Sequence, residues 1–363
     1  MHDKTYQLTL FQIYPEIADT VARIQLGTFP TPVHPLAAIE RENLWIKRED
    51  LSSDVYGGNK IRKLEFILAE ARRRHCKHLI TFGGIGTHHG LATAIFCNQI
   101  GIRCTLLLFH QPVTEQVKQN LLLLKKFNAR MMYKKNLWRA VVYYYLIYRI
   151  TYPGAYFVYA GGSSMLGNIG HVDAAFELKE QIERGDMPEP ALLFCPVSSG
   201  GTLAGLSLGL QLAGLTTHVV GVQVTASHLG PFQACTKNTV EKQMKQTYSY
   251  LKERCRRLPN ITIKVPSIME NYLGEGYGVP TDAGNKMSHL LKETEGISLD
   301  PTYTAKTFAA VMDYCRKRRS DTEAVLYWHT FNSVDLSAQA KELNYLDLPP
   351  SLQRSIDEPS VIL

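Results

Sequence analysis

The feature that most constrains the fold is a repeated pattern of a short apolar run, a glycine-bearing loop and a helical stretch. Apolar runs of β-strand type occupy residues 78–82, 104–109, 155–160, 191–197, 218–224 and 324–328. Short apolar strands that alternate with helices are typical of βαβ units and of parallel sheets with both faces covered. We therefore expect an α/β protein with open, twisted, mainly parallel sheets.

The length of 363 residues allows one large domain or two domains of ordinary size. Hydrophobic residues make up 45% and charged residues 20% of the chain, which is an ordinary globular composition. The arrangement of the strands predicts two domains. Residues 55–160 would form a small βαβ domain, and residues 1–54 together with 161–363 would form a larger one.

Charge and cysteine usage exclude several classes of partner. The net charge of +7 is mild for this length, and basic residues cluster at the ends of expected helices, as at 72–74. This is not the basic stripe of a nucleic-acid-binding protein. The seven cysteines are scattered and form no CxxC pair, which argues against a disulfide framework. We expect a cytoplasmic protein in a reducing compartment.

The most apolar run, residues 140–148, lies between Arg139 and Arg149. It is far shorter than the roughly 20 residues that cross a bilayer. We therefore expect a buried helix here and no membrane partner.

Three glycine-rich loops, at 83–86, 161–167 and 198–201, follow expected strands. Parallel sheets bind ligands beyond the carboxyl ends of their strands, so these loops are candidates for a binding site. The segment SSGGT, 198–202, leads into a helix, and its N–H groups and hydroxyls would cradle an anion. This loop lacks the GxxxxGK[ST] pattern of a P-loop. In the loop at 83–86, Gly84 and Gly86 are followed by histidine at position 89, where the GxGxxG dinucleotide pattern needs glycine. A nucleotide site is therefore disfavoured, and a plain tight turn stays an alternative.

Lys60 follows Tyr56-Gly57-Gly58-Asn59 and begins an amphipathic stretch. Glycines permit unusual backbone angles, so Lys60 is expected at a loop-to-helix junction. Taken alone, this segment also suits a simple turn in which Asn59 caps the helix. Lysine amines form Schiff bases with aldehydes when they are partly desolvated. Lysine and anion cradle together suggest the cofactor pyridoxal 5′-phosphate, with the lysine on the aldehyde and the SSGGT loop on the phosphate.

Seven segments, in this order, carry a resemblance to a known family: KREDLSS–YGGNKIRKLEFILAEA, GGIGTHHG, GGSSMLGNIGHVDAA, SSGGTLAGL, EGYG, LDPTYTAKTF and LYWHT. The chain resembles the D-cysteine desulfhydrase and 1-aminocyclopropane-1-carboxylate (ACC) deaminase family over roughly residues 25–335. That family belongs to the tryptophan-synthase-β-like pyridoxal-phosphate enzymes of fold type II. The resemblance implies the same fold and a homodimer.

The resemblance also implies roles for individual residues in holding the cofactor. Lys60 would be the Schiff-base lysine and would move the α-proton of the substrate. Asn59 would orient the cofactor, His88 would lie near the oxygen on its ring, and Thr304 would be the partner of its pyridine nitrogen. The phosphate would be wrapped by Ser198, Ser199, Gly200, Gly201 and Thr202, although the family usually has glycine where Ser198 stands.

The substrate side shows both matches and departures. The resemblance implies that Tyr277 and Tyr303 are active-site tyrosines, which in a tyrosine-rich chain could otherwise be packing residues. Thr87, His88 and His89 stand where the family usually has Ser-Asn-His; the serine binds the substrate carboxylate or assists proton transfer. The family also usually has glutamine at Gly86 and glycine at Phe331. These changes suggest an altered pocket. The adjacent histidines lack further ligands at metal-binding spacing, so no metal is expected.

Two positions separate the branches of the family. ACC deaminases carry glutamate where this chain has Thr304 and leucine where it has Thr330. A carboxylate can keep the pyridine ring protonated, whereas a neutral hydroxyl is expected to give a weaker electron sink. Elimination of a thiol needs less help, so D-cysteine desulfhydrase chemistry on a small amino acid is favoured. ACC deamination, a non-catalytic protein that binds pyridoxal phosphate and a nucleotide-binding protein remain alternatives.

Overall fold

The computed structural model describes residues 7–39, 43–229, 232–318 and 322–357. The chain divides into two compact units, each described here by itself. Unit 1 consists of residues 1–66 and 163–333, and unit 2 of residues 67–162 and 334–363. Helix α3 (Lys60–Arg73) begins in unit 1 and ends in unit 2. The domain boundaries expected from the sequence stay a prediction.

Unit 1 is built on a six-stranded sheet with the order β1-β2-β12-β7-β8-β11. All neighbours are parallel except β1 and β2. Three strands confirm runs expected from the sequence, whereas β1, β2 and β11 were not foreseen. Their bounds are β1 (Val33–Pro35), β2 (Leu44–Arg48), β7 (Leu192–Val197), β8 (His218–Gln223), β11 (Ser267–Met269) and β12 (Val325–His329).

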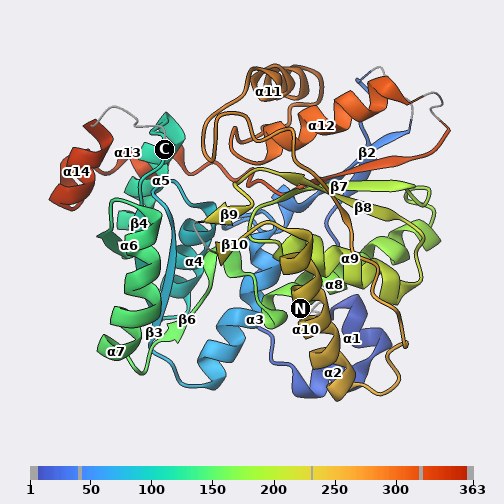
Figure 1. Cartoon of the computed structure of the whole chain (residues 1–363), viewed down its shortest axis with the longest axis horizontal. Coiled ribbons are helices and arrows are strands. Elements are labelled where there is room, and N and C mark those ends of the chain that lie inside the picture. The colour runs from blue at the N-terminus through green and yellow to red at the C-terminus, as the bar shows by residue number, and fades with distance from the viewer. Residues whose placement is uncertain (1–6, 40–42, 230–231, 319–321, 358–363) are drawn as a thin grey trace, which may run out of the picture. The chain divides into compact units, whose positions relative to one another are not determined.

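Helices cover both faces of this sheet. Both α9 and α12 contact β7 and β8, and Figure 1 shows α12 on one side of these strands and α9 on the other. Helix α8 packs along α9. The helices of unit 1 besides α3 are α1 (Thr9–Ile13), α2 (Pro15–Thr20), α8 (Met165–Glu183), α9 (Gly201–Ala213), α10 (Lys237–Arg254), α11 (Asp282–Glu295) and α12 (Thr304–Lys317), with a 3-10 turn η1 (Glu49–Leu51) and a small antiparallel pair of β9 (His228–Leu229) and β10 (Phe232–Gln233).

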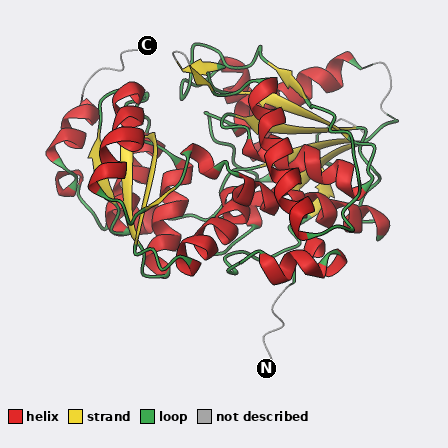
Figure 2. Ribbon diagram, turned by 60° about the horizontal axis from the view of Figure 1, so that its bottom comes forward, coloured by secondary structure: helices red, strands yellow, loops and turns green. Residues whose placement is uncertain are grey.

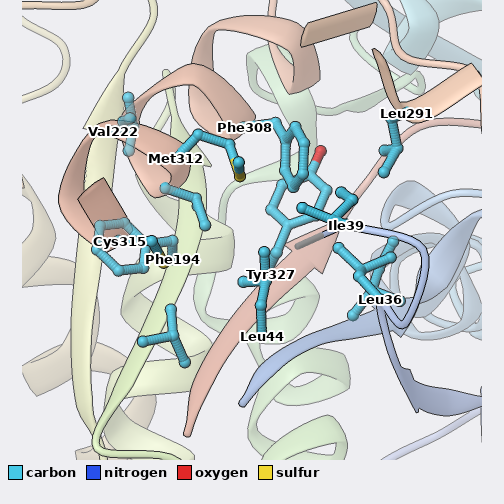
Figure 3. Packing of buried hydrophobic residues seen from close by; sticks show 14 of the residues in the cluster. Leu36, Ile39, Leu44, Phe194, Val222, Leu291, Phe308, Met312, Cys315 and Tyr327 are labelled. Carbon is cyan, nitrogen blue, oxygen red and sulfur yellow. The ribbon is translucent and has the colours of Figure 1, made fainter. Parts of the chain in front are cut away.

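The core under α12 follows from alternation along the strands. Phe194 of β7 and Tyr327 of β12 point to the face that Phe308 and Met312 of α12 cover, as Figure 3 shows. Successive side chains of a strand point to opposite faces. Trp328, the next residue of β12, is also fully buried, so both faces of this strand are covered. This is the burial expected for a central parallel strand.

Unit 2 holds a four-stranded, all-parallel sheet with the order β5-β4-β3-β6. Figure 2 shows these strands (yellow) between helices (red). The strand expected at 155–160 is shorter than predicted, because the chain turns into a 3-10 segment at Ala160–Gly162. The bounds are β3 (His78–Gly84), β4 (Arg103–Phe109), β5 (Arg130–Tyr133), β6 (Tyr156–Phe157), α4 (His88–Gln99), α5 (Glu115–Lys126), α13 (Ser337–Lys341) and α14 (Pro350–Asp357), with a 3-10 turn at Tyr345–Asp347.

The expectation of a buried helix at 140–148 is confirmed for the helix but not for its burial, which is only partial. The segment is helical, as α6 (Leu137–Val142), a π-helical turn (Tyr143–Ile147) and α7 (Tyr148–Thr151). However, Leu146 is 62% exposed and Tyr145 is 43% exposed. Ala140, Tyr144 and Tyr148, one helical turn apart, are buried in the core of unit 2, and Val141 and Tyr143 pack against it while only partly buried. In the described parts of the chain, no helix combines the length and the apolar character that crossing a membrane requires.

Candidate cofactor and active site

Lys60 is the first residue of α3, as expected, and the two glycines before it are needed for close packing. Gly58 has a left-handed backbone (φ +94°), and a Cβ on it would lie 2.8 Å from the carbonyl oxygen of Phe331 and 2.9 Å from that of Thr330. A Cβ on Gly57 would overlap the carbonyl oxygen of Asp50. The loop before Lys60 is therefore seated on the backbone that follows β12.

The Lys60 amine is prepared for nucleophilic chemistry. Burial lowers the pKa of this amine to about 8, while the negative charge of Asp300 acts in the opposite direction. Among the residues that the structure describes, no hydrogen bond or ion pair involves the Lys60 amine. An amine with this pKa is partly neutral near neutral pH and can attack an aldehyde.

Asn59 connects this lysine to the start of α9. Its side-chain amide is buried and donates to the Thr202 hydroxyl over 2.9 Å. Gly200 has the left-handed backbone (φ +84°) that glycine favours, and α9 begins at Gly201. The first N–H groups of a helix have no acceptor inside the helix, so this end of α9 can bind an anion.

A second buried lysine stands at the same helix end, and the sequence interpretation missed it. Lys63 donates to the Ser163 hydroxyl over 3.2 Å, and that hydroxyl also accepts from the Gly201 N–H at 3.1 Å. Ser163 and Ser199 are bonded at 2.7 Å. Burial, followed by the charge of Lys60, holds the pKa of Lys63 well below its usual range. The spacing of Lys63 from Lys60, one turn along α3, was the signal that could have revealed it.

The two tyrosines expected at the substrate are brought together. The hydroxyls of Tyr277 and Tyr303 are 2.5 Å apart, and their rings meet edge to face. Burial raises the pKa of both phenols, so both keep their protons near neutral pH. The loop that carries Tyr277 is tied to α12 by Lys306, whose amine donates to the carbonyl oxygens of Leu273 and Gly276.

Thr304 begins α12 and is fully buried, but its closest partner is a residue absent from the sequence interpretation. The Thr304 hydroxyl donates to the carboxylate of Asp300 over 2.7 Å. The Asp300 N–H in turn donates to the Thr304 oxygen over 2.7 Å. Asp300 is 1% exposed and lies in the LDPTYT segment, so that motif contributes a carboxylate as well as a hydroxyl.

Thr330 contributes through its backbone, because its carbonyl oxygen accepts from the Asn59 N–H at 3.3 Å. The preceding His329 is buried and bonds to the Tyr327 hydroxyl, which also donates to the Thr304 carbonyl oxygen. The structure thus ties the end of β12 to both α3 and α12. The substrate role of Thr330 stays a prediction.

Thr87, His88 and His89 lie in unit 2, at the start of α4. Thr87 caps this helix, since its hydroxyl accepts from the Gly90 N–H at 3.1 Å. His89 is buried, and its Nε2 is bonded to Thr81 of β3 at 3.1 Å, while His88 is only partly buried. Their roles toward cofactor and substrate stay predictions.

Gly86 has no room for the glutamine that the family usually carries there. A Cβ on Gly86 would lie 2.6 Å from Val117 and 2.9 Å from the side-chain amide of Gln111. The Gln111 amide oxygen also accepts from the Gly86 N–H. The buried side-chain amide of Gln111 thus lies beside Gly86, the position where the family usually has the amide of a glutamine. Among the described residues, no cluster of three or more potential metal ligands is found.

Comparison with known proteins decides the family. The family model described as pyridoxal-phosphate dependent enzyme matches residues 24–330. The chain belongs to this family. D-cysteine desulfhydrase from Salmonella newport is 32% identical over 87% of this chain and 95% of its own length. A Thermotoga maritima protein, provisionally named an ACC deaminase, is 30% identical over 88% of this chain and 99% of its own.

Solved structures agree with the expected fold. A crystal structure described as an ACC deaminase homologue superposes with a TM-score of 0.75 at 26% identity, covering 93% of this chain and 98% of that chain. Threonine deaminase isoform 2 from Solanum lycopersicum superposes with a TM-score of 0.59 at 17% identity, covering 93% and 88%. The fold is therefore that of the fold type II pyridoxal-phosphate enzymes. The protein is a pyridoxal-phosphate-dependent enzyme of the ACC deaminase and D-cysteine desulfhydrase group.

The residues of unit 1 fit this cofactor. A buried amine of lowered pKa, Lys60, is available for the aldehyde. At the start of α9, a Cβ on Gly201 would lie 2.5 Å from the Ser163 hydroxyl and 2.8 Å from the Lys63 amine. Hydroxyls, an amine and helix N–H groups therefore converge on a glycine-lined helix end, which is a donor set for a phosphate.

Proposed function

We propose that the enzyme eliminates the thiol from a small β-substituted amino acid, D-cysteine in particular, giving pyruvate, sulfide and ammonia. The observation that carries the proposal is the buried Lys60 amine, joined through Asn59 to Thr202 at the start of α9. Support for the substrate comes from the D-cysteine desulfhydrase relative and from Thr304 and Thr330, which match that branch.

The bound cofactor would supply an electron sink for the negative charge left on Cα when the Cα–H bond breaks. Lys60 would hold the cofactor, and its Nζ would then accept the α-proton. Thr304 would lie at the pyridine nitrogen. A pKa of about 8 makes the Lys60 amine a usable base near neutral pH, whereas an ordinary lysine is almost fully protonated. Elimination breaks the Cβ–S bond, and sulfur leaves with the electron pair. The released 2-aminoacrylate then takes up water and gives pyruvate and ammonia.

Lys63 and the hydroxyls of Ser163, Ser199 and Thr202 would bind the phosphate. Tyr277 and Tyr303 would act as hydrogen-bond donors toward the substrate, because burial keeps both phenols protonated. The departing thiolate and the substrate carboxylate are the groups toward which these phenols would donate.

Two alternatives use the same cofactor. ACC deamination is supported by the Thermotoga maritima relative and by the structure described as an ACC deaminase homologue. A non-catalytic cofactor-binding role is suggested by the departures from the family pattern in residues 86–89 and 330–332, Phe331 included. We also propose a homodimer, from the family resemblance, and a cytoplasmic location, to which the seven free cysteines are suited.

The test is the absorption spectrum of the purified protein with cofactor, for wild type, Lys60→Ala and the exposed control Lys77→Ala. We expect the visible band of a lysine-bound cofactor in wild type and Lys77→Ala, and its loss in Lys60→Ala. D-cysteine and then ACC are added to the same samples, and pyruvate, sulfide, 2-oxobutyrate and ammonia are assayed.

Each outcome decides between the alternatives. Sulfide and pyruvate from D-cysteine support the proposal, and 2-oxobutyrate from ACC supports the first alternative. A band without turnover of either compound favours a binding role or another substrate. A band that persists in Lys60→Ala contradicts the role of this lysine.

A further inference from the structure

Asp300 is a buried acid whose two carboxylate oxygens are both filled by donors. One oxygen accepts from the backbone N–H groups of Thr302 and Tyr303, at 3.0 and 2.7 Å. The other accepts from the N–H and the hydroxyl of Thr304, at 3.1 and 2.7 Å. Each oxygen thus accepts two hydrogen bonds, which leaves no place for a proton. The geometry is that of a carboxylate with its negative charge at the positive end of α12.

This carboxylate dictates the direction of the Thr304 hydroxyl. A hydroxyl has one proton and two lone pairs. The proton of Thr304 is given to Asp300, and one lone pair accepts the Asp300 N–H. Within the described part of the chain no other donor is bonded to this oxygen. Toward any further partner, Thr304 can therefore act only as an acceptor.

The role of Asp300 rests on the proposed function, in which Thr304 lies at the pyridine nitrogen of the cofactor. An oxygen that can only accept will bond to the nitrogen only when the nitrogen carries a proton. We propose that Asp300 is a positioning residue that acts through the Thr304 hydroxyl to hold the pyridine nitrogen of the cofactor in its protonated form.

The balance of charge supports the same conclusion. Among the described residues, no lysine, arginine or histidine forms an ion pair with Asp300. A buried charge without a counter-charge is costly. The groups whose pKa values respond to the Asp300 charge are Lys60, Lys306, His329 and the phenols of Tyr56, Tyr277, Tyr303 and Tyr327. The amine of Lys306 is already engaged by two carbonyl oxygens. With Lys60 engaged by the cofactor, a protonated ring nitrogen, one hydroxyl away, would place a positive charge beside the Asp300–Thr304 pair.

The Asp300 carboxylate revises an expectation drawn from the sequence. Threonine in place of glutamate at position 304 was expected to leave the ring unprotonated and the electron sink weak. Because the Thr304 hydroxyl donates to Asp300, a carboxylate charge is still present, separated from the ring nitrogen by this one hydroxyl. Residue 304 by itself then does not decide between elimination from D-cysteine and opening of the ACC ring.

The test is ¹⁵N NMR of the holoenzyme reconstituted with pyridoxal phosphate labelled at the ring nitrogen, because protonated and unprotonated pyridine nitrogens resonate at well-separated positions. We expect the protonated position in wild type and in Thr304→Ser, which keeps the hydroxyl. We expect the unprotonated position in Thr304→Val and in Asp300→Asn. A merely structural role of Asp300 would lower stability and activity without moving this resonance.

An unprotonated nitrogen in wild type overturns the inference, as does a resonance in Asp300→Asn that matches wild type. If Asp300→Asn does not fold, wild type and the two Thr304 variants still decide. The visible band of the lysine-bound cofactor, recorded on the same samples, distinguishes failure of the Asp300 role from failure of the proposed function. A Lys60-dependent band with an unprotonated nitrogen refutes only the role of Asp300, whereas failure to take up the cofactor refutes the proposed function and the inference with it.

Discussion

One buried acid, Asp173, should make the stability of the protein depend on pH in a way that a single substitution can isolate. It lies in a buried ionic cluster in which Lys47 and Arg62 pair with Glu177 and Glu49. Two cations there already balance two acids, so Asp173 is a third, surplus acid. Its Oδ2 lies 3.7 Å from Arg62, and its Oδ1 accepts the Leu10 N–H at 2.9 Å. Burial raises the pKa of Asp173 to about 7, with Arg62 acting against the rise and Glu177 adding to it.

The direction of the effect follows from proton binding. Between the unfolded pKa of 3.8 and the folded value of about 7, the folded state binds more protons than the unfolded state. The contribution of Asp173 to stability is therefore fully present below the unfolded pKa and is lost as the pH rises toward 7. From about pH 5 to about pH 8 the loss from this one group is roughly 2–3 kcal/mol, at about 1.4 kcal/mol for each pH unit below the folded pKa.

Asp173→Asn replaces the acid by a neutral group of the same shape and should remove this dependence. The assay is urea unfolding at several pH values for wild type, Asp173→Asn and Asp19→Asn, an exposed control. Fluorescence of Trp45 and Trp328 reports on unit 1, which contains Asp173. As the pH rises, we expect the free energy of unfolding of wild type to fall relative to that of Asp173→Asn. A difference that stays constant from pH 5 to pH 8 would refute the reasoning.

Two further predictions concern the cofactor and the substrate. Lys63→Met should weaken binding of pyridoxal phosphate roughly 10- to 100-fold, the loss of one charge-assisted hydrogen bond, with Lys77→Met as the control. An unchanged dissociation constant, measured by titration of the apoprotein, would exclude Lys63 from the phosphate site. Tyr303→Phe should lower kcat on the true substrate by roughly 100-fold, because one donor of the tyrosine pair is lost, without altering the visible cofactor band. A kcat close to wild type would show that Tyr277 alone suffices or that the pair has only a packing role.

Much of the fold could be predicted because the central strands are continuous apolar runs between glycine loops. The runs at 191–197 and 218–224 became β7 and β8 almost residue for residue. Strand β2 was missed because its sequence, LWIKR, contains two cations. Lys47 is nevertheless fully buried, since Glu177 lies in α8, far away in the sequence, and pairs with it. A single sequence does not reveal such a distant partner.

For the site, local signals and family resemblance indicated Lys60, Asn59 and the loop at 198–202. What they did not indicate was how hydroxyls and charges are paired. Thr304 was interpreted as a neutral group because its carboxylate partner, although only four residues away, becomes a partner only when α12 begins at Thr304. The apolar run at 140–148 misled for a related reason, because hydrophobicity alone does not show which face of a helix meets the core.

The segment from Asp300 to Thr304 joins a carboxylate, a phenol and a hydroxyl within five residues at the start of one helix. None of the three depends on strand register for its position relative to the others. In evolutionary terms, the groups proposed to control the protonation of the cofactor are therefore carried by one short segment, here called a cassette, that could be exchanged as a unit. Exchange of this cassette between relatives would transfer those groups without repacking the sheet, which makes it a natural starting point for redesigning the reaction.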